Sequence, residues 1–352
     1  MFPKNSQFSH TFLIFSSIIF SVMFFGSIGV SRAEASAKPA STKLTRIFYY
    51  VDNEEARLSL FQHPDSIDIL APQAYSIDDK GNLTGSLNPA VTEFVQKKNI
   101  KVMPLVTNAG FDKISVALFL DDQAAQALAI QSLISEAQKQ KFYGWQLDFE
   151  QINLTYRDKY SAFVQKAGQA FKKANLVLSV AVVSKISDIP SDYPKTLWDD
   201  LIGAYDYASL ASSTDFISIM SYDDPVSKGP VARYSWLKKV IDYGLQFIPA
   251  SKLSLGIPMY YWKWNDATGK LVGIGGYAGI KNTLDTRKVT LGYSTAEQAP
   301  FLKYKVGKNH YTLWYENAKS IAKKISLINQ NGLQGFSAWV LGLETPSVYS
   351  VF

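Results

Sequence analysis

The chain has 352 residues, of which 47% are hydrophobic and 19% charged, so it can bury a sizeable core and is not intrinsically disordered. It has no cysteine and only three histidines, which excludes disulfides and cysteine-bound zinc and argues against a metal site or a Ser-His-Asp triad. We therefore expect no metal and no cofactor. A surface with a net charge of +6 could bind an anionic membrane or an acidic polymer. Because the chain has no long Lys/Arg run, we expect a solvated basic surface and no nucleic-acid partner.

The N-terminus resembles a targeting segment. An apolar run over residues 12–30 follows Lys4, and Ala33–Ala37 fits an A-x-A cleavage pattern. We expect a signal peptide over 1–37 and a linker over 38–44. The run is also long enough to span a bilayer, so an uncleaved anchor is the alternative and would be the only membrane contact. Either way the remainder is expected to be exported, as an extracellular, periplasmic or wall-associated protein.

Eight short β-rich runs recur along the chain with helical stretches between them. Several are almost entirely apolar, as expected for parallel strands buried on both faces. This alternation predicts an α/β fold, a closed (β/α)8 TIM barrel over residues 45–352. The predicted strands are Thr45–Val51, Asp68–Ile77, Lys101–Asn108, Tyr143–Glu150, Asn175–Val183, Phe216–Asp223, Leu253–Tyr261 and Gly335–Leu341.

Amphipathic stripes predict three helices clearly. One covers residues 127–137 and starts at Asp121-Asp122; a second covers 156–171 behind a Thr155-x-x-Asp158 capping pattern; a third covers 318–328 and stops at Asn331-Gly332. Residues 262–315 are too long for a simple crossover between strands seven and eight. They predict a small inserted subdomain rich in Gly and Tyr.

The fourth predicted strand carries the most informative side chains. Because side chains alternate along a strand, Gln146, Asp148 and Glu150 are expected to point into the barrel together. Glu150 falls at the C-terminal end of the strand, where barrel active sites lie. The two carboxylates are roughly 6–7 Å apart along the strand, so their titrations couple and one pKa can rise toward the range of a general acid. The alternative is a buried polar ladder with Arg or Lys partners.

Both carboxylates come from one strand and therefore lie on the same side of a bound ligand. An ordinary retaining or inverting glycosidase needs carboxylates that flank the bond. The pair suits a mechanism in which a sugar substrate supplies its own nucleophile. The aromatic content of 14% is consistent either with a ring-lined sugar cleft or with a well-packed core.

Four segments in order resemble glycoside hydrolase family 18, the chitinase-like barrels. The family pattern D-x-x-D-x-D-x-E appears as Tyr143-x-x-Gln146-x-Asp148-x-Glu150, with only the last two acids matched. M-x-Y-D is matched by Met220–Asp223, G-x-P-x-Y by Gly256–Tyr260, and the tryptophan that ends strand eight by Trp339. The likeness covers nearly all of residues 45–352.

The resemblance implies roles for individual residues. Glu150 would protonate the glycosidic oxygen, Asp148 would orient the 2-acetamido group and stabilise an oxazolinium, and Tyr222 would hydrogen-bond the acetamido carbonyl. The substrate-binding residues would be Trp339 as a floor under the sugar, Asp223, Gln146 and Tyr260. Tyr222 and Trp339 as plain core aromatics are the alternative.

Two departures from the pattern matter. Gln146 replaces an acid that helps Asp148 in chitinases; an amide can hydrogen-bond Asp148 but cannot take a proton, so we expect lower or differently pH-tuned activity. Pro104–Asn108 replaces the usual strand-three S-x-G-G. Together with Leu313–Asn317 and Trp339–Gly342 it resembles the bacterial spore-germination, cortex-lytic N-acetylglucosaminidase branch.

These observations predict a monomeric enzyme that hydrolyses β-linked N-acetylglucosamine polymers, either peptidoglycan or chitin-like. The alternative is a non-catalytic, lectin-like protein on the same fold. Family members of that kind usually lose the acid that corresponds to Glu150, so its presence favours the enzyme.

Overall fold

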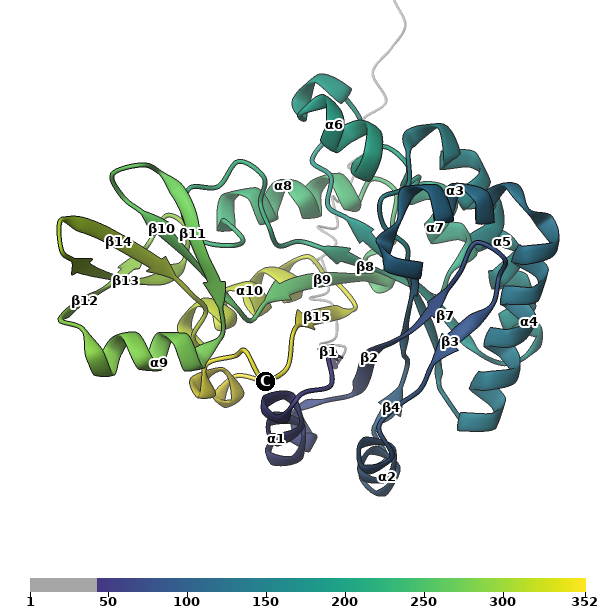
Figure 1. The fold of residues 1–352 in the computed structure, drawn as a ribbon, viewed down its shortest axis with the longest axis horizontal. Helices are drawn as coiled ribbons and strands as arrows, with labels where there is room; N and C mark the ends of the chain where they lie inside the picture. The colour runs from purple at the N-terminus through teal and green to yellow at the C-terminus, as the bar shows by residue number, and fades with distance from the viewer. Residues whose placement is uncertain (1–42) are drawn as a thin grey trace, which may run out of the picture. The chain divides into compact units, whose positions relative to one another are not determined.

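Eight parallel strands close into a barrel in the computed structural model, which describes residues 43–352 (Figure 1). The order β1-β15-β9-β8-β7-β6-β5-β2 returns to β1, and every pairing around the ring is parallel. The predicted (β/α)8 fold and all eight strands are confirmed. The strands are β1 (Thr45–Tyr50), β2 (Ile69–Ile77), β4 (Lys101–Val102) with β5 (Leu105–Asn108), β6 (Gly144–Asp148), β7 (Val177–Val183), β8 (Phe216–Met220), β9 (Leu253–Pro258) and β15 (Gly335–Trp339).

The predicted third strand is split into β4 and β5 around Met103-Pro104. Pro104 has no N–H to donate, although its carbonyl still accepts from the N–H of Gln146 on β6 at 3.0 Å. A short strand, β3 (Leu83–Gly85), pairs with the end of β2 as a hairpin. The signal peptide predicted over 1–37 lies outside the described residues, as do the linker residues before 43.

Helices connect the strands and cover the outside of the barrel. Asp122 caps the N-terminus of α4, as predicted, and its side chain accepts hydrogen bonds from the N–H groups of Ala124 and Ala125. The predicted Thr155 cap is wrong, because Asn153 accepts from Thr155 and a short 3₁₀ turn precedes α5. The helices are α1 (Glu54–Gln62), α2 (Pro89–Lys97), α3 (Lys113–Asp121), α4 (Gln123–Gln140), α5 (Arg157–Lys173), α6 (Lys195–Leu197), α7 (Tyr207–Ser213), α8 (Tyr234–Gly244) and α10 (Ala318–Gln330).

A separate antiparallel sheet occupies the chain between β9 and α10. Its order is β11-β10-β14-β13-β12, and helix α9 (Tyr277–Thr286) packs on one face through Ile280, Leu302 and Leu313. The sheet and α9 lie at the left of Figure 1, beside the barrel. We call this unit the insertion subdomain. Its strands are β10 (Tyr261–Asn265), β11 (Lys270–Gly275), β12 (Val289–Ser294), β13 (Ala299–Val306) and β14 (Asn309–Trp314).

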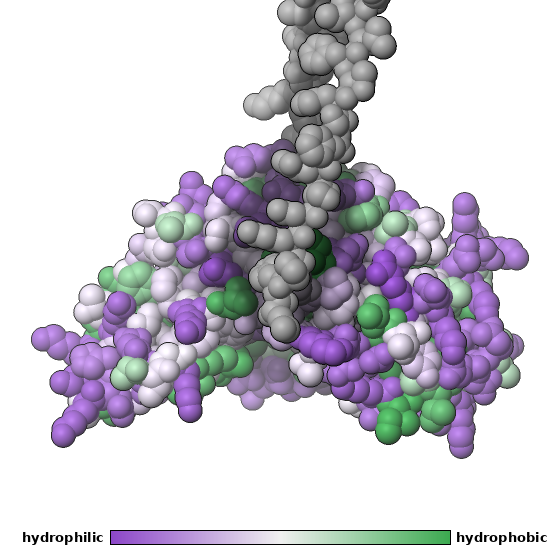
Figure 2. All heavy atoms as spheres, turned by 90° about the horizontal axis from the view of Figure 1, so that it is seen from above, coloured by the Kyte–Doolittle hydropathy of each residue, from purple (hydrophilic) through white to green (hydrophobic). Residues whose placement is uncertain are grey.

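The surface of this unit and of the barrel is mixed rather than continuously apolar. Figure 2 shows hydrophilic side chains over most of the visible face, with hydrophobic ones in scattered spots. Within residues 43–352 no helix is both long enough and apolar enough to cross a bilayer.

One buried ion pair links barrel helix α10 to the segment just before it. Lys324 of α10 is fully buried and donates to both carboxylate oxygens of Glu316 at 2.7 and 2.8 Å. We expect Lys324→Met to lower the free energy of unfolding by about 3–5 kcal/mol, because it leaves a buried charge without its partner. The double variant Lys324→Met/Glu316→Leu should recover most of that loss in urea denaturation. Equal destabilisation by the single and double variants would contradict this explanation.

Candidate active site

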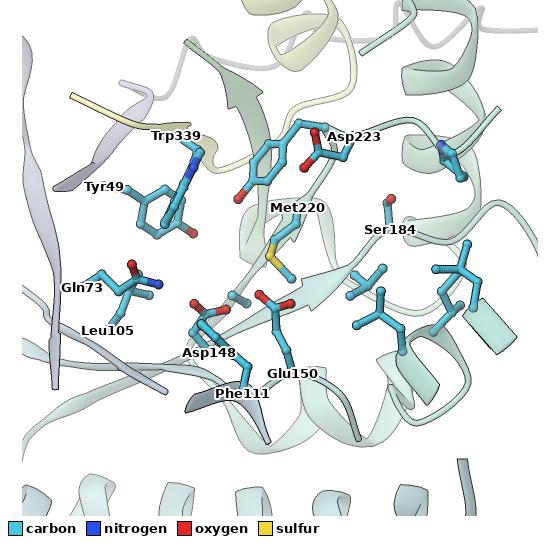
Figure 3. A pocket seen from close by; sticks show the side chains of 17 residues that line it. Tyr49, Gln73, Leu105, Phe111, Asp148, Glu150, Ser184, Met220, Asp223 and Trp339 are labelled. Carbon is cyan, nitrogen blue, oxygen red and sulfur yellow. The ribbon is translucent and has the colours of Figure 1, made fainter. Parts of the chain in front are cut away.

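A cavity of about 430 Å³ opens at the C-terminal ends of the barrel strands. Residues from β1, β2, β5, β6, β7, β8 and β15 contribute to it, so it lies where barrel enzymes place their chemistry. Figure 3 shows the carboxyl groups of Asp148 and Glu150 rising side by side into this space, with Trp339 and Asp223 on the other side. The lining residues are Tyr49, Gln73, Leu105, Phe111, Asp148, Glu150, Ala181, Val183, Ser184, Leu197, Leu201, Ile202, Met220, Tyr222, Asp223, Pro225 and Trp339.

The alternation of β6 explains why both carboxyl groups reach the cavity. Trp145, one position out of phase, faces the surrounding helices and donates its indole N–H to the carbonyl of Leu133 on α4 at 2.9 Å. Asp148, the last residue of β6, is only 4% exposed and lies deeper than Glu150, which is two residues beyond the end of the strand. The inward direction predicted for these side chains is therefore observed.

The backbone around Glu150 is fixed from two sides. Asn108, at the end of β5, accepts from the N–H of Glu150 at 2.9 Å. The hydroxyl of Tyr205 donates to the carbonyl of Phe149 at 2.7 Å. Gln151 then turns the chain away with a φ of 57°. Hydrogen bonds on both sides thus fix the backbone from which the carboxyl group of Glu150 enters the cavity.

Burial changes the acidity of all three carboxyl groups in the cavity. Loss of hydration, with the charge of Glu150 as a second cause, raises the pKa of Asp148 to about 8. Burial and then the nearby charge of Asp223 raise the pKa of Glu150. Burial also raises the pKa of Asp223, although the hydrogen bond from Tyr260 lowers that pKa in part. In this cavity a carboxyl group therefore keeps its proton at a pH closer to neutral than it would in water.

Aromatic side chains form the wall opposite the β6 carboxyl groups. Trp339 packs against Tyr49 with ring centroids 5.3 Å apart, and Tyr222 meets Tyr260 edge-on at 6.4 Å. The hydroxyl of Tyr260 donates to Asp223 at 2.6 Å. Trp339, Tyr222 and Asp223 line the cavity, whereas Tyr260 lies behind Asp223 and does not.

The structure corrects the expectation for Gln146, which is fully buried below the cavity and does not line it. Its oxygen accepts from Tyr49 at 2.7 Å, and its amide donates to Ser179 and Ser218 at 2.8 and 2.9 Å. These partners use its donors, so it does not hydrogen-bond Asp148, and Asp148 Oδ1 is buried without a partner among the described residues. The prediction that Gln146 binds the substrate directly is therefore wrong, because its side chain does not reach the cavity.

The hydrogen-bonded layer around Gln146 was missed by the sequence analysis. Ser337 bridges Ser218 and Ser254 at 2.8 and 2.7 Å, which extends the neutral network across the barrel. A signal was present, since β7, β8, β9 and β15 each carry a single interior serine between apolar residues. This layer contains no group that ionises near neutral pH, so it cannot accept a proton from Asp148.

Other cavity residues were given no role from the sequence, although Met220 opens the M-x-Y-D match. Tyr49 of β1, Ala181 of β7 and Met220 of β8 line the cavity together with Asp148. Gln73 of β2 also projects into it (Figure 3). All follow the same inward alternation, which could have identified Tyr49 once β1 was assigned. Among residues 43–352 no cluster of three His, Asp or Glu side chains is arranged to hold a metal ion.

The charge of Asp223 leads to a testable pH effect. An enzyme that uses Glu150 as its proton donor would lose activity as pH rises through the pKa of Glu150. Asp223→Asn removes a negative charge that raises it, so the alkaline limb of the kcat/KM profile should move toward lower pH. The matched variant Asp158→Asn, on the exposed surface of α5, should leave the limb in place. An unchanged limb in Asp223→Asn would show that the two groups do not interact.

A barrel whose C-terminal mouth holds inward carboxyl groups opposite an aromatic floor has the architecture of a glycosyl hydrolase. The chain belongs to glycosyl hydrolases family 18, whose model matches residues 21–344. One relative by sequence, the glycosylase YvbX of Bacillus subtilis, is 27% identical over 300 residues that cover 83% of this chain and 85% of YvbX. The chain is thus a glycosyl hydrolase by family and by fold.

Cortex-lytic enzymes are also among its relatives, which confirms the resemblance to that branch. The cortical fragment-lytic enzyme of B. subtilis is 26% identical over 78% of this chain, and the matched part spans 64% of that enzyme. The structure of a chitinase from Chromobacterium violaceum superposes with a TM-score of 0.76 at 27% identity, covering 87% of this chain and 97% of the other. The spore cortex-lytic enzyme SleL of Bacillus megaterium shares the fold with a TM-score of 0.77 at 22% identity, over 88% and 73% of the two chains.

Proposed function

We propose that this enzyme hydrolyses β-linked N-acetylglucosamine polymers, peptidoglycan or chitin-like, by substrate-assisted retaining catalysis. One observation carries the proposal: Asp148, the last residue of β6, and Glu150, two residues later, enter the cavity on one side of the space that a sugar would occupy. The third carboxyl group, Asp223, is engaged by the hydroxyl of Tyr260. This arrangement favours an internal nucleophile over a carboxylate that attacks from the opposite side.

In the first step the acetamido oxygen of the substrate attacks C1 as the C1–O bond of the leaving group breaks. Glu150 gives its proton to the departing oxygen, and its raised pKa keeps that proton available. The positive charge that develops on the oxazolinium lowers the pKa of Asp148, which releases its proton to solvent through the open cavity. As a carboxylate, Asp148 then accepts from the acetamido N–H and offsets that charge. Tyr222 donates to the acetamido oxygen.

In the second step water attacks C1 and opens the oxazolinium ring. Glu150, now a carboxylate, takes the proton from that water and returns to its starting state. Trp339 offers a flat apolar surface for the C–H face of the sugar. Tyr49, Ala181 and Met220 line the same cavity as Asp148 and offer apolar surface to the acetamido methyl group.

The charge of the cavity supports a neutral sugar at the bond that is cleaved. Three carboxyl groups line it, and no Lys, Arg or His is among its lining residues within the described chain. A neutral N-acetylhexosamine meets no repulsion there, whereas a carboxylated sugar would find like charge and no cation. This favours N-acetylglucosamine as the unit bound next to Asp148.

The test is digestion of purified peptidoglycan and of chitin oligosaccharides, with products identified by mass. New reducing ends on N-acetylglucosamine are expected, and a thiazoline analogue of the cyclic intermediate should inhibit competitively. Turnover without thiazoline inhibition would point to a different mechanism. Sugar binding without any turnover would favour the lectin-like alternative.

We also propose that the enzyme is exported, on the basis of the apolar run over residues 12–30 and the A-x-A pattern at Ala33–Ala37. N-terminal sequencing of the protein recovered from its natural compartment checks this. A new N-terminus near Ala35–Lys38 is expected for a cleaved signal peptide, and an intact N-terminus in the membrane fraction for an anchor.

A further inference from the structure

The positive charge of the chain is concentrated in the insertion subdomain. Residues 261–315 carry eight Lys and Arg against three Asp and Glu, a net of +5 in a chain whose total is +6. Within residues 43–352, only Lys281 of these eight forms a salt bridge, with Asp285. The left end of the face shown in Figure 2, which belongs to this unit, is largely hydrophilic. The other seven cations are therefore available to an anionic partner.

Two of those cations converge on a groove between α9 and the sheet, outside the catalytic cavity. The groove has a volume of about 400 Å³, and no acidic residue lines it. Trp262 and Trp264 mark the opposite face of the sheet, which packs toward Tyr222 and Trp339. The groove thus lies on the far side of the sheet from the catalytic residues. Its principal polar and aromatic residues are Tyr261, Lys263, Asn282, Arg287, Tyr304 and Tyr311.

The groove is shaped by glycines that make room for its functional groups. A Cβ at Gly273 would meet Lys263 Cε at 2.7 Å, so the lysine stem can lie flat across β11 only because Gly273 has no side chain. A Cβ at Gly275 or Gly279 would meet the hydroxyl of Tyr261 at 2.9 or 2.7 Å. Neither Lys263 Nζ nor the Tyr261 hydroxyl has a hydrogen-bond partner in the described part of the chain.

Two tyrosines complete the groove with ring faces suited to sugars. Tyr304 and Tyr311 stack with centroids 5.4 Å apart and planes 25° from parallel. Burial raises the pKa of Tyr304, and the nearby charge of Arg287 opposes that rise. Asn282 and two threonines add neutral hydrogen-bonding groups suited to sugar hydroxyls.

We propose that this groove binds a carboxylated sugar unit of a polysaccharide, with the ring on Tyr304 and Tyr311 and the carboxylate between Lys263 and Arg287. The two sites then have opposite preferences: the catalytic cavity suits a neutral sugar and the groove an acidic one. A glycan that alternates neutral and acidic sugars would satisfy both. The groove site goes beyond the proposed cleavage chemistry, and its test needs no turnover.

The test measures binding of the full chain to three polymers by fluorescence anisotropy, with every protein also carrying Glu150→Gln to prevent cleavage. The probes are peptide-free peptidoglycan strands with free lactyl carboxylates, the same strands after amidation of those carboxylates, and a phosphodiester-linked teichoic acid. We expect Lys263→Gln and Arg287→Gln each to weaken binding of the carboxylated strands roughly three- to fivefold, and the double variant about tenfold or more. The amidated strands can still enter the catalytic cavity, so they should bind more weakly than the carboxylated strands, and the groove variants should not change their affinity.

Lys303→Gln is the matched control, since Lys303 lies on the other face of β13 with its ammonium over Phe301. It removes the same charge from the same sheet and should change binding less than about twofold. Equal losses for Lys303→Gln and Lys263→Gln would reduce the effect to net charge and overturn the proposal. So would equal binding of the amidated strands, or tighter binding of the phosphodiester polymer. Hydrolysis of short chitin oligosaccharides by the protein with Glu150 intact reports on the catalytic site independently.

Discussion

Replacing Glu150 with glutamine should lower kcat by roughly 10²–10⁴-fold on N-acetylglucosamine oligosaccharides while leaving their binding nearly unchanged. Glutamine keeps the shape of the side chain but has no proton to give and cannot act as a base in the second step. The backbone of this residue is held by Asn108 and through Phe149 by Tyr205, so the substitution should not move the chain. Initial rates and calorimetric binding to the same oligosaccharide separate the two effects.

The leaving group provides a sharper check on the acid role. An aryl glycoside with an acidic phenol needs little protonation, so the loss in the first step should be much smaller with that substrate. Glu93→Gln on the exposed face of α2 is the matched control and should behave as the unmodified enzyme. A Glu150→Gln enzyme with near-normal turnover of natural oligosaccharides would remove Glu150 from the acid role.

Asp148→Asn should lower kcat by about 10²-fold or more on N-acetylated substrates, because an amide cannot offset the charge of the oxazolinium. The same substitution should make the folded protein more stable. Asp148 is buried and its folded pKa of about 8 lies above the ordinary value of an unfolded aspartate, so the folded state binds the extra proton. The unmodified protein therefore loses stability as pH rises from about 4 to about 8, and the loss is complete above that range.

The asparagine variant lacks this pH-dependent loss. Its free energy of unfolding should exceed that of the unmodified protein by about 3–5 kcal/mol above pH 8 and by little near pH 4. Urea denaturation at both pH values, with Asp158→Asn as the exposed control, measures the difference. A variant that is slower but no more stable at high pH would show that Asp148 is well solvated or paired.

Most of the fold could be predicted because a parallel strand buried on both faces appears in the sequence as a short, almost entirely apolar run. The eight apolar runs and the helices between them require the barrel, and alternation along β6 places Asp148 and Glu150 inside it. Strand ends were predicted less well, since β6 ends at Asp148 and β8 at Met220, before the residues that turn into the cavity.

Interactions across the barrel could not be predicted from one strand at a time. The hydroxyl of Tyr49 reaches Gln146 from a strand 97 residues earlier, and this contact decides that Gln146 is part of the interior network rather than a partner of Asp148. The groove on the insertion subdomain depends likewise on where α9 packs. Its glycines and tyrosines are plain in the sequence, but their convergence is a property of the folded unit.

The configuration of the first product tests the proposed mechanism most directly. Attack by the acetamido oxygen followed by water is a double displacement at C1, so β-linked substrate should give the β anomer before mutarotation. Proton NMR of a chitin oligosaccharide digest in its first minutes measures the anomeric ratio. A predominance of the β anomer is expected; a predominance of the α anomer would mean a single displacement and would contradict the proposed roles of Asp148 and the substrate's own acetamido group.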